Sequence, residues 1–294
     1  NAGTNQSVVQ GDTACFDGGD SSDRNGDVVS YSWEISSKPE GSTATLDDST
    51  AVAPCIATDL AGSYTVSLIV NDGVVDSASD AAEAAASSYS DAITETFQET
   101  VTTINTISPE LFKKAKQQNK LTDKINAIMI LTDQGNYTKA HRKIQQILNK
   151  LDGCAVSGTP DKKDLIQDCA AQDQIYPLVE KGIGHLDNMI NAITETLHLH
   201  LQEMVTLVNA LDSDVFKKHT GTNKMSDKFE DAIEPSDNGN YSKTIEKLQD
   251  VLRNTDGCTV SGTPDKKDWI QNCESQEQIY PLIMETIEYL ESIM

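Results

Sequence analysis

The sequence has little of what a catalytic site or a membrane span requires. Its longest apolar run is only a few residues, far short of the roughly 20 that a helix needs to cross a bilayer. It contains no HExxH, GxSxG or Walker A motif and no complete GxGxxG. The five histidines include one close pair, His198 and His200, and residues two apart on a helix do not face each other. We therefore expect neither an enzyme nor a membrane-spanning protein, and we assign no catalytic residue.

Positive charge is also scarce. Lys and Arg number 23 against 46 Asp and Glu, which gives a formal net charge of −23. A field of that sign repels phosphate backbones and anionic membrane surfaces, so we expect no nucleic-acid partner. It also attracts divalent cations, although a solvated acidic surface explains the same composition. No signal peptide is visible and residue 1 is Asn, from which we expect a processed mature form.

Cysteines are few, and none lies in a CxxC or CxxCH motif. Zinc ribbons, thioredoxin-like redox sites and c-type haem therefore have no support. The count is even and one spacing recurs, which favours disulfides over free thiols in a cytosolic protein. We predict three local pairs, Cys15–Cys55, Cys154–Cys169 and Cys258–Cys273. Because disulfides persist in oxidising compartments, these pairs predict a secreted or cell-surface protein.

An internal duplication organises the C-terminal two-thirds of the chain. Residues 153–169, GCAVSGTPDKKDLIQDC, return at 257–273 as GCTVSGTPDKKDWIQNC, with 14 of 17 positions identical. Helical apolar periodicity runs through both copies. We therefore predict two all-α repeats, over 92–190 and 191–294.

The apolar stripe does not break between the two copies. Helical spacing continues from Leu178 to Leu211, so we predict one long helix over about 175–211 that ends the first repeat and begins the second. Within the duplicated cysteine loop, Asp164 and Asp268 suit helix N-caps better than a binding site.

The first 78 residues are typical of β-structure. Polar and apolar residues alternate there, with apolar side chains at Val29, Tyr31, Trp33 and Ile35 and again from Tyr64 to Val70. Gly, Asn, Asp and Pro turn residues separate these runs. The pattern predicts a β-sandwich over 1–78 with Trp33 in its core. Residues 79–91 are rich in Ala and Ser, which makes poor strand sequence and predicts a linker or the frayed start of a helix.

Four motifs lie along the predicted sandwich in a fixed order. They are Asp17–Asp27 (DGGDSSDRNGD), Tyr31-Ser-Trp33, Ala61–Val66 (AGSYTV) and Val70–Gly73 (VNDG). In that order they make the N-terminal domain resemble a PKD domain. The resemblance implies an Ig-like sandwich that acts as a spacer or adhesion module, on surface proteins or beside secreted hydrolases. Cys15 and Cys55 are additions to the usual pattern.

The helical repeats resemble a module seen at the C-terminal ends of large secreted or surface proteins of bacteria and archaea, often beside PKD domains. The resemblance rests on Gly-Asn-Tyr, Asp-Gly-Cys, Pro-Asp-Lys-Lys-Asp and Gln-Ile-Tyr-Pro-Leu, over about 92–294. It implies a location rather than a reaction, because we know of no established activity for the module.

Oxygen-bearing side chains crowd the loop at 17–27. In a sandwich of this order the loop lies near the one after the sixth strand, and such ligands suit Ca²⁺. Some PKD-like domains hold calcium here, so we predict a calcium site formed by Asp17, Asp20, Asp23, Asn25, Asp27 and Asp72. The alternative is a turn in which Asp and Asn side chains bond their own backbone.

Three asparagines begin N-glycosylation sequons: Asn5, Asn136 and Asn240. The last two are equivalent in the two repeats and lie where helices are predicted to begin. A helix N-cap explains these two without an attached sugar, so both readings stay open.

Together these patterns predict a multidomain α and β protein. An N-terminal Ig-like β-sandwich is followed by two tandem all-α helical repeats joined by a long shared helix. We expect a non-enzymatic extracellular structural or interaction protein, such as a surface-layer or fibre subunit or an adhesive module. It would self-associate, with Asn1–Gln10 pairing with a neighbour's sheet, or bind a surface protein or polysaccharide. The alternatives are an accessory polysaccharide- or protein-binding segment of a secreted hydrolase and a calcium-dependent regulatory module.

Overall fold

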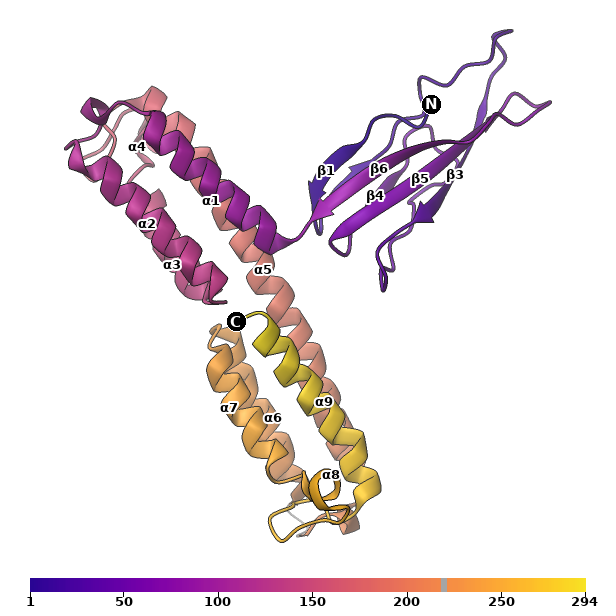
Figure 1. Cartoon of the computed structure of the whole chain (residues 1–294), viewed down its shortest axis with the longest axis vertical. Coiled ribbons are helices and arrows are strands. Elements are labelled where there is room, and N and C mark those ends of the chain that lie inside the picture. Colours follow the sequence, from indigo (N-terminus) through magenta and orange to yellow (C-terminus); the bar gives the residue numbers. More distant parts are fainter. Residues whose placement is uncertain (218–220) are drawn as a thin grey trace. The chain divides into compact units, whose positions relative to one another are not determined.

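The chain divides into two compact units, Asn1–Glu95 and Thr96–Met294. The computed structural model describes residues 1–217 and 221–294, apart from the side chain of Asn223 (Figure 1). Lys218 and His219 therefore lie outside the described residues. The expected mixture of an N-terminal sheet domain and a helical C-terminal region is confirmed.

Two sheets form the N-terminal unit. The larger one has the strand order β1-β6-β5-β3, and the smaller one pairs β2 with β4. Strands β3 and β6 both run antiparallel to β5, whereas β1 runs parallel to β6. The strands are β1 (Gln6–Val9), β2 (Thr13–Cys15), β3 (Ser30–Ser37), β4 (Cys55–Ala57), β5 (Gly62–Asn71) and β6 (Asp80–Ser87).

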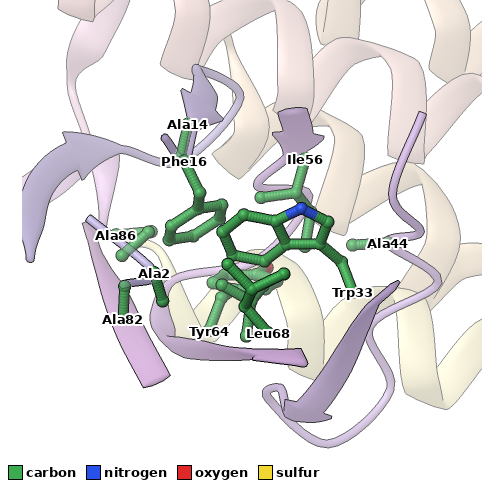
Figure 2. Packing of buried hydrophobic residues seen from close by; sticks show 12 residues of the cluster. Ala2, Ala14, Phe16, Trp33, Ala44, Ile56, Tyr64, Leu68, Ala82 and Ala86 are labelled. Atoms are coloured by element: carbon green, nitrogen blue, oxygen red, sulfur yellow. The ribbon is translucent and has the colours of Figure 1, made fainter. Parts of the chain in front are cut away.

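Aromatic side chains fill the space between these two sheets. Phe16 and Trp33 lie against each other with ring centroids 6.3 Å apart, and Figure 2 shows Ile56, Tyr64 and Leu68 around them. The indole nitrogen of Trp33 donates to the carbonyl of Ala51 at 3.0 Å, so the one polar atom of the ring is satisfied. The prediction of Trp33 as a core residue is confirmed by its 4% exposure.

The segment predicted as an Ala/Ser-rich linker, 79–91, instead forms β6 and the first turn of a helix. Alanine has poor strand propensity, but β6 lies between β1 and β5 and is hydrogen-bonded on both edges. Its inward positions, Ala82, Ala84 and Ala86, are buried. Position in the sheet therefore outweighs intrinsic propensity here.

The N-terminal strand also differs from its prediction. Residues Gln6–Val9 pair with Ala84–Ser87 of their own chain rather than remaining open to a neighbour. The backbone amide of Ala2 donates to Asp80 at 2.8 Å, which fixes the start of the chain beside β6. Strand β6 is therefore paired on this side by β1 of its own chain.

The helical unit contains the two predicted copies in the same order. In the first copy, helix α1 (Tyr89–Thr106) begins in the N-terminal unit, and the single turn η1 (Pro109–Leu111), α2 (Lys116–Asp133), α3 (Tyr137–Leu148) and α4 (Gly153–Ser157) follow. The shared helix is α5 (Cys169–Ala210). The second copy continues with η2 (Ser213–Val215), α6 (Gly221–Asp237), α7 (Tyr241–Leu252), α8 (Gly257–Ser261) and α9 (Cys273–Ser292).

Helix α5 belongs to both copies, as its unbroken apolar stripe predicts. It runs for 42 residues and starts six positions before the predicted 175. Helix α3 packs against its N-terminal half, and α6 and α9 pack against its C-terminal half (Figure 1). Helix α2 packs on α3, and α7 packs on α6 and α9. Among the described residues, no helix combines the length and the apolar character that crossing a bilayer requires.

Candidate functional site

All three predicted cysteine pairs form disulfides. Cys15 and Cys55 link β2 to β4 directly across the small sheet, with Cα atoms 4.0 Å apart. In the helical unit each disulfide joins a short helix, α4 or α8, to the first residue of α5 or α9, with a Cα separation of 5.4 Å in both copies. The cysteine loops, residues 153–169 and 257–273, are therefore closed in the same way.

A completely buried carboxylate organises each cysteine loop. Asp164 accepts hydrogen bonds from the Asp161 amide at 2.6 Å and from the side-chain amide of Gln172 at 2.9 Å. A longer bond of 3.4 Å reaches it from the Gly153 amide. Asp268 repeats this arrangement in the second copy. Neither is the helix N-cap that the sequence predicts, because Asp168 and Asn272 take that position by accepting from Ala171 and Ser275.

Glycine is required beside each buried carboxylate. A Cβ atom on Gly153 would overlap the Asp164 carboxylate, and one on Gly257 would overlap Asp268. Sequence reasoning missed this contact, although the conserved spacing between the two copies was its signal. Each cysteine loop is a close-packed unit rather than an open binding loop.

Acidic groups gather at the same place in both repeats. Carboxylate oxygens of Asp152, Asp161 and Asp164 lie within 4.8 Å of one another, as do those of Asp256, Asp265 and Asp268. The buried member of each group is held by backbone and glutamine donors, and Asp161 accepts from the backbone amide of Lys163 at 2.5 Å. These bonds give the carboxylates a structural role in closing the loop.

Three of the residues predicted to bind calcium accept hydrogen bonds from nearby backbone amides. Asp17 accepts from the Gly19 amide at 2.8 Å and Asp23 from the Asn25 amide at 2.5 Å. Asp72 accepts from two successive amides at 2.9 Å each, and these bonds lower the pKa of its carboxyl group. In the part of the chain that the structure describes, no three acidic groups of this set converge within 4.8 Å. Calcium binding by Asp17, Asp20, Asp23, Asn25, Asp27 and Asp72 stays a prediction, beside the turn interpretation.

Tyr64 forms a tyrosine corner, in which a tyrosine hydroxyl bonds back to the chain a few residues upstream. The Tyr64 hydroxyl lies 2.7 Å from the Leu60 carbonyl and 2.8 Å from a carboxylate oxygen of Asp59. Ser42 and Thr43 also donate to Asp59. Burial alone would raise the pKa of Asp59, but these hydrogen bonds outweigh it and hold the pKa well below its usual range.

The three sequon asparagines are exposed. Asn5 accepts from the Glu83 amide at 2.9 Å, and Asn240 caps α7 by accepting from Lys243 at 3.3 Å. Asn136 occupies the equivalent position before α3 but donates to Gln134 instead. The N-cap interpretation holds for Asn240, and glycosylation stays a prediction for all three.

The two histidines of the close pair contact different partners. His198 lies 3.0 Å from Asp237, whereas the His200 ring lies 3.2 Å from the Thr286 hydroxyl. They therefore do not share a ligand, as their spacing on the helix predicts.

A junction between the repeats was not foreseen from the sequence. Gly135, which follows α2, lies against Ile293 at the C-terminal end, and Gly239, which follows α6, lies against Thr138 of α3. Both glycines have positive φ, 66° and 64°, so each ends its helix in a left-handed turn. The Gly-Asn-Tyr motif of each copy therefore contacts the other copy.

Tyrosine side chains are buried near this junction. Burial, followed by the nearby Tyr289 and Tyr137, raises the pKa of Tyr241 to about 12. Its hydroxyl is buried and has no hydrogen-bond partner among the described residues. Such a group costs stability rather than adding it, which makes the junction a place where substitution is informative.

Comparison with known proteins finds a family match for the N-terminal domain. Residues 2–84 match the family model described as K319L-like, PKD domain. The chain is similar to the solution structure of the PKD domain from KIAA 1837 protein, at 23% identity and a TM-score of 0.26, over 30% of this chain and 84% of that one. It is also similar to a nucleoside hydrolase-related hypothetical protein from Saccharophagus degradans that is associated with carbohydrate metabolism, at 20% identity and a TM-score of 0.25, over 29% of this chain and 22% of that one. Curated proteins gave no match.

The family match makes the N-terminal domain a PKD domain, as its motifs predict. A PKD domain indicates an extracellular interaction or structural module, and the three disulfides are consistent with that location. The match covers the N-terminal domain alone, so the family resemblance of the helical repeats stays a prediction.

Proposed function

We propose that the chain is a non-enzymatic structural protein of the cell surface that self-associates into a fibre or layer. One observation carries the proposal: a PKD domain is joined to two disulfide-closed helical repeats that share one 42-residue helix. The two repeats contact each other, and a disulfide closes each one. Such an arrangement suits a structural spacer, since each repeat buries surface against the next. The buried aspartates of the cysteine loops serve closure rather than chemistry.

The contact between neighbouring molecules needs a surface other than the N-terminal strand. Strand β1 is already paired with β6 of its own chain, so strand exchange with a neighbour would first have to break those bonds. An interface between exposed side chains needs no such opening. We therefore look for the self-association surface on the helical repeats.

Light scattering over a concentration series tests the proposal on the full oxidised chain. We expect the mean mass to rise with concentration at moderate ionic strength, and negative-stain images of the same samples to show linear or sheet-like assemblies. A strict monomer at the highest concentration would overturn the assembly proposal and leave a monomeric PKD-bearing module that binds another partner.

A further inference from the structure

Positive charge is not spread evenly along this acidic chain. Residues 96–190 hold 12 of the 23 Lys and Arg residues against 11 Asp and Glu. Residues 1–95 hold only 2 against 16, and residues 191–294 hold 9 against 19. The first helical repeat is therefore nearly neutral overall, and its cations are gathered between two strongly acidic stretches of sequence.

Five of these cations lie on α2, on α3 and in the turn that follows α3. The lysine patch consists of Lys116, Lys120, Lys124, Lys143 and Lys150. Three of its members surround a small pocket of about 120 Å³ whose floor is formed by Ile128 and Ile147. Burial, followed by the charges of Lys150 and Lys120, lowers the pKa of Lys124. Lysines of the patch thus repel one another at the edge of an apolar floor.

The second repeat shows what is missing from the lysine patch. At the positions equivalent to Lys124 and Lys143, Lys228 lies 3.3 Å from Asp250 and Lys247 lies 3.5 Å from Asp231. The equivalent of Lys120 is Lys224, whose ammonium group lies 4.3 Å from the centre of the Trp269 ring. Each of these three cations is therefore compensated within its own repeat.

The first repeat has these lysines without the partners that the second repeat supplies. Ala127, Gln146 and Leu165 stand where the second repeat has Asp231, Asp250 and Trp269. Within residues 1–217 and 221–294, no ion pair engages a lysine of the patch. A set of like charges without internal counter-ions favours carboxylates supplied from outside.

Carboxylates with the matching spacing lie on α6 of the second repeat. Glu230 and Glu234 are exposed, stand one helical turn apart, and line a groove between α5 and α6. Neither forms an ion pair among the described residues. On α2, Lys120 and Lys124 have the same four-residue spacing, so two ammonium–carboxylate pairs can form between one face of each helix.

We propose that the lysine patch of one molecule binds the acidic face of α6, formed by Glu230 and Glu234, on a second molecule. The inference rests on the proposed self-association and names its surface. Because the two faces differ, the contact is heterologous and can repeat from copy to copy as an open chain. Its strength depends on exposed charge pairs, so raised salt weakens it.

A charge-swap experiment tests the contact on the full chain. One variant carries Lys120→Glu and Lys124→Glu, and the other carries Glu230→Lys and Glu234→Lys. We expect each variant alone to weaken association at least about tenfold, since like charges then meet at the interface. Mixing the two variants should restore association, because each now offers the charge that the other lacks. A general loss of folding would not be rescued by mixing.

A gentler variant keeps the test valid if a reversal disturbs folding. Ala127→Asp with Gln146→Asp installs the two ion pairs of the second repeat in the first. It should weaken association, because Lys124 and Lys143 then have partners within their own repeat and three uncompensated lysines of the five remain. The matched control, Asp231→Ala with Asp250→Gln, should leave association intact or strengthen it.

The outcomes separate this inference from the proposed function. Association of the wild type that persists unchanged in Ala127→Asp/Gln146→Asp, or a mixture of swapped variants that stays monomeric, overturns the patch and leaves self-association standing. A strictly monomeric wild type overturns both. Retention of that monomer on immobilised polygalacturonate, lost in the same variant, would assign the patch to an acidic polysaccharide instead.

Discussion

One carboxylate, Asp59, holds the tyrosine corner of the PKD domain together. It accepts hydrogen bonds from Ser42 and Thr43 and lies 2.8 Å from the Tyr64 hydroxyl. Its pKa in the folded state lies below its unfolded value of about 3.9. Its stabilisation is therefore present above about pH 4 and is lost as pH falls towards the folded pKa.

The pH dependence of Asp59→Asn measures that contribution. At pH 7 we expect this variant to lower the free energy of unfolding of the PKD domain by about 1–2 kcal/mol, and the difference should shrink below pH 4. Denaturant titration followed by Trp33 fluorescence, in a Trp269→Phe background, measures this domain alone. The exposed Glu40→Gln is the control, and an equal effect of both variants at pH 7 would contradict the role given to Asp59.

The predicted calcium site at 17–27 is testable with the same fluorescence signal. Extracellular calcium modules bind with Kd values of roughly 0.1–1 mM. At about 10 mM calcium the PKD domain should therefore gain about 1–3 kcal/mol, with a higher Tm. The gain should fall in Asp23→Asn/Asp27→Asn and be absent with chelator. If the side chains serve only their own turns, as Asp17 and Asp23 do in the structure, calcium will leave the Tm unchanged.

At the scale of elements, helix α5 carries a pair of glycines in contrasting surroundings. A Cβ atom on Gly182 would overlap the ring of Phe97, whereas one on Gly184 would meet nothing within 4 Å. Gly184→Ala should therefore stabilise the helical unit by about 0.5–1 kcal/mol, because alanine is the better helix former. Gly182→Ala should destabilise it by about 1–3 kcal/mol through overpacking. Urea unfolding followed by circular dichroism checks both signs, and a shared sign would refute the packing of Phe97 on Gly182.

The cysteine loops offer a second test among the elements. Replacing Cys154 and Cys169 by serine removes a disulfide between cysteines that are 15 positions apart in the sequence. In the chain-entropy model this should lower the free energy of unfolding by about 3 kcal/mol. The same replacement at Cys258 and Cys273 should cost a similar amount, because the two loops have the same geometry. Urea unfolding of the oxidised proteins measures both. A negligible loss in either would mean that the buried aspartate closes the loop without its disulfide.

The elements differ in how far the sequence predicts them. The shared helix follows from a long apolar stripe, and the cysteine pairs follow from a duplicated spacing. Strand β6 does not, because its alanines form a strand only between two hydrogen-bonded neighbours. The buried role of Asp164 was also missed, since a cap and a core hydrogen-bond acceptor have the same local sequence. Comparison of the two repeats shows that Ala127 replaces Asp231, but only the structure shows which lysines lose a counter-ion.

At the scale of the whole helical unit, the two repeats are tied by more than α5. The helix-ending glycines Gly135 and Gly239 each lie against the other copy. Because each repeat contributes one of these glycines and contacts the other, a substitution at the junction should destabilise both repeats. Glycine also supplies the positive φ at these turns, so a substitution there combines local strain with a contact between repeats.

A matched pair of glycines separates those two effects. Gly239 and Gly262 have φ values of 64° and 77°, so alanine at either position costs about 1 kcal/mol of left-handed strain. Only Gly239 faces the other repeat, where its Cβ would overlap Thr138; Gly262 meets nothing within 4 Å. Gly239→Ala should therefore exceed Gly262→Ala by about 1–2 kcal/mol in urea unfolding. It should also speed hydrogen exchange in α3, which belongs to the other repeat, and Thr138→Ala should recover part of the loss. Equal costs for the two glycines, with α3 exchange unchanged, would mean that the repeats are joined by α5 alone.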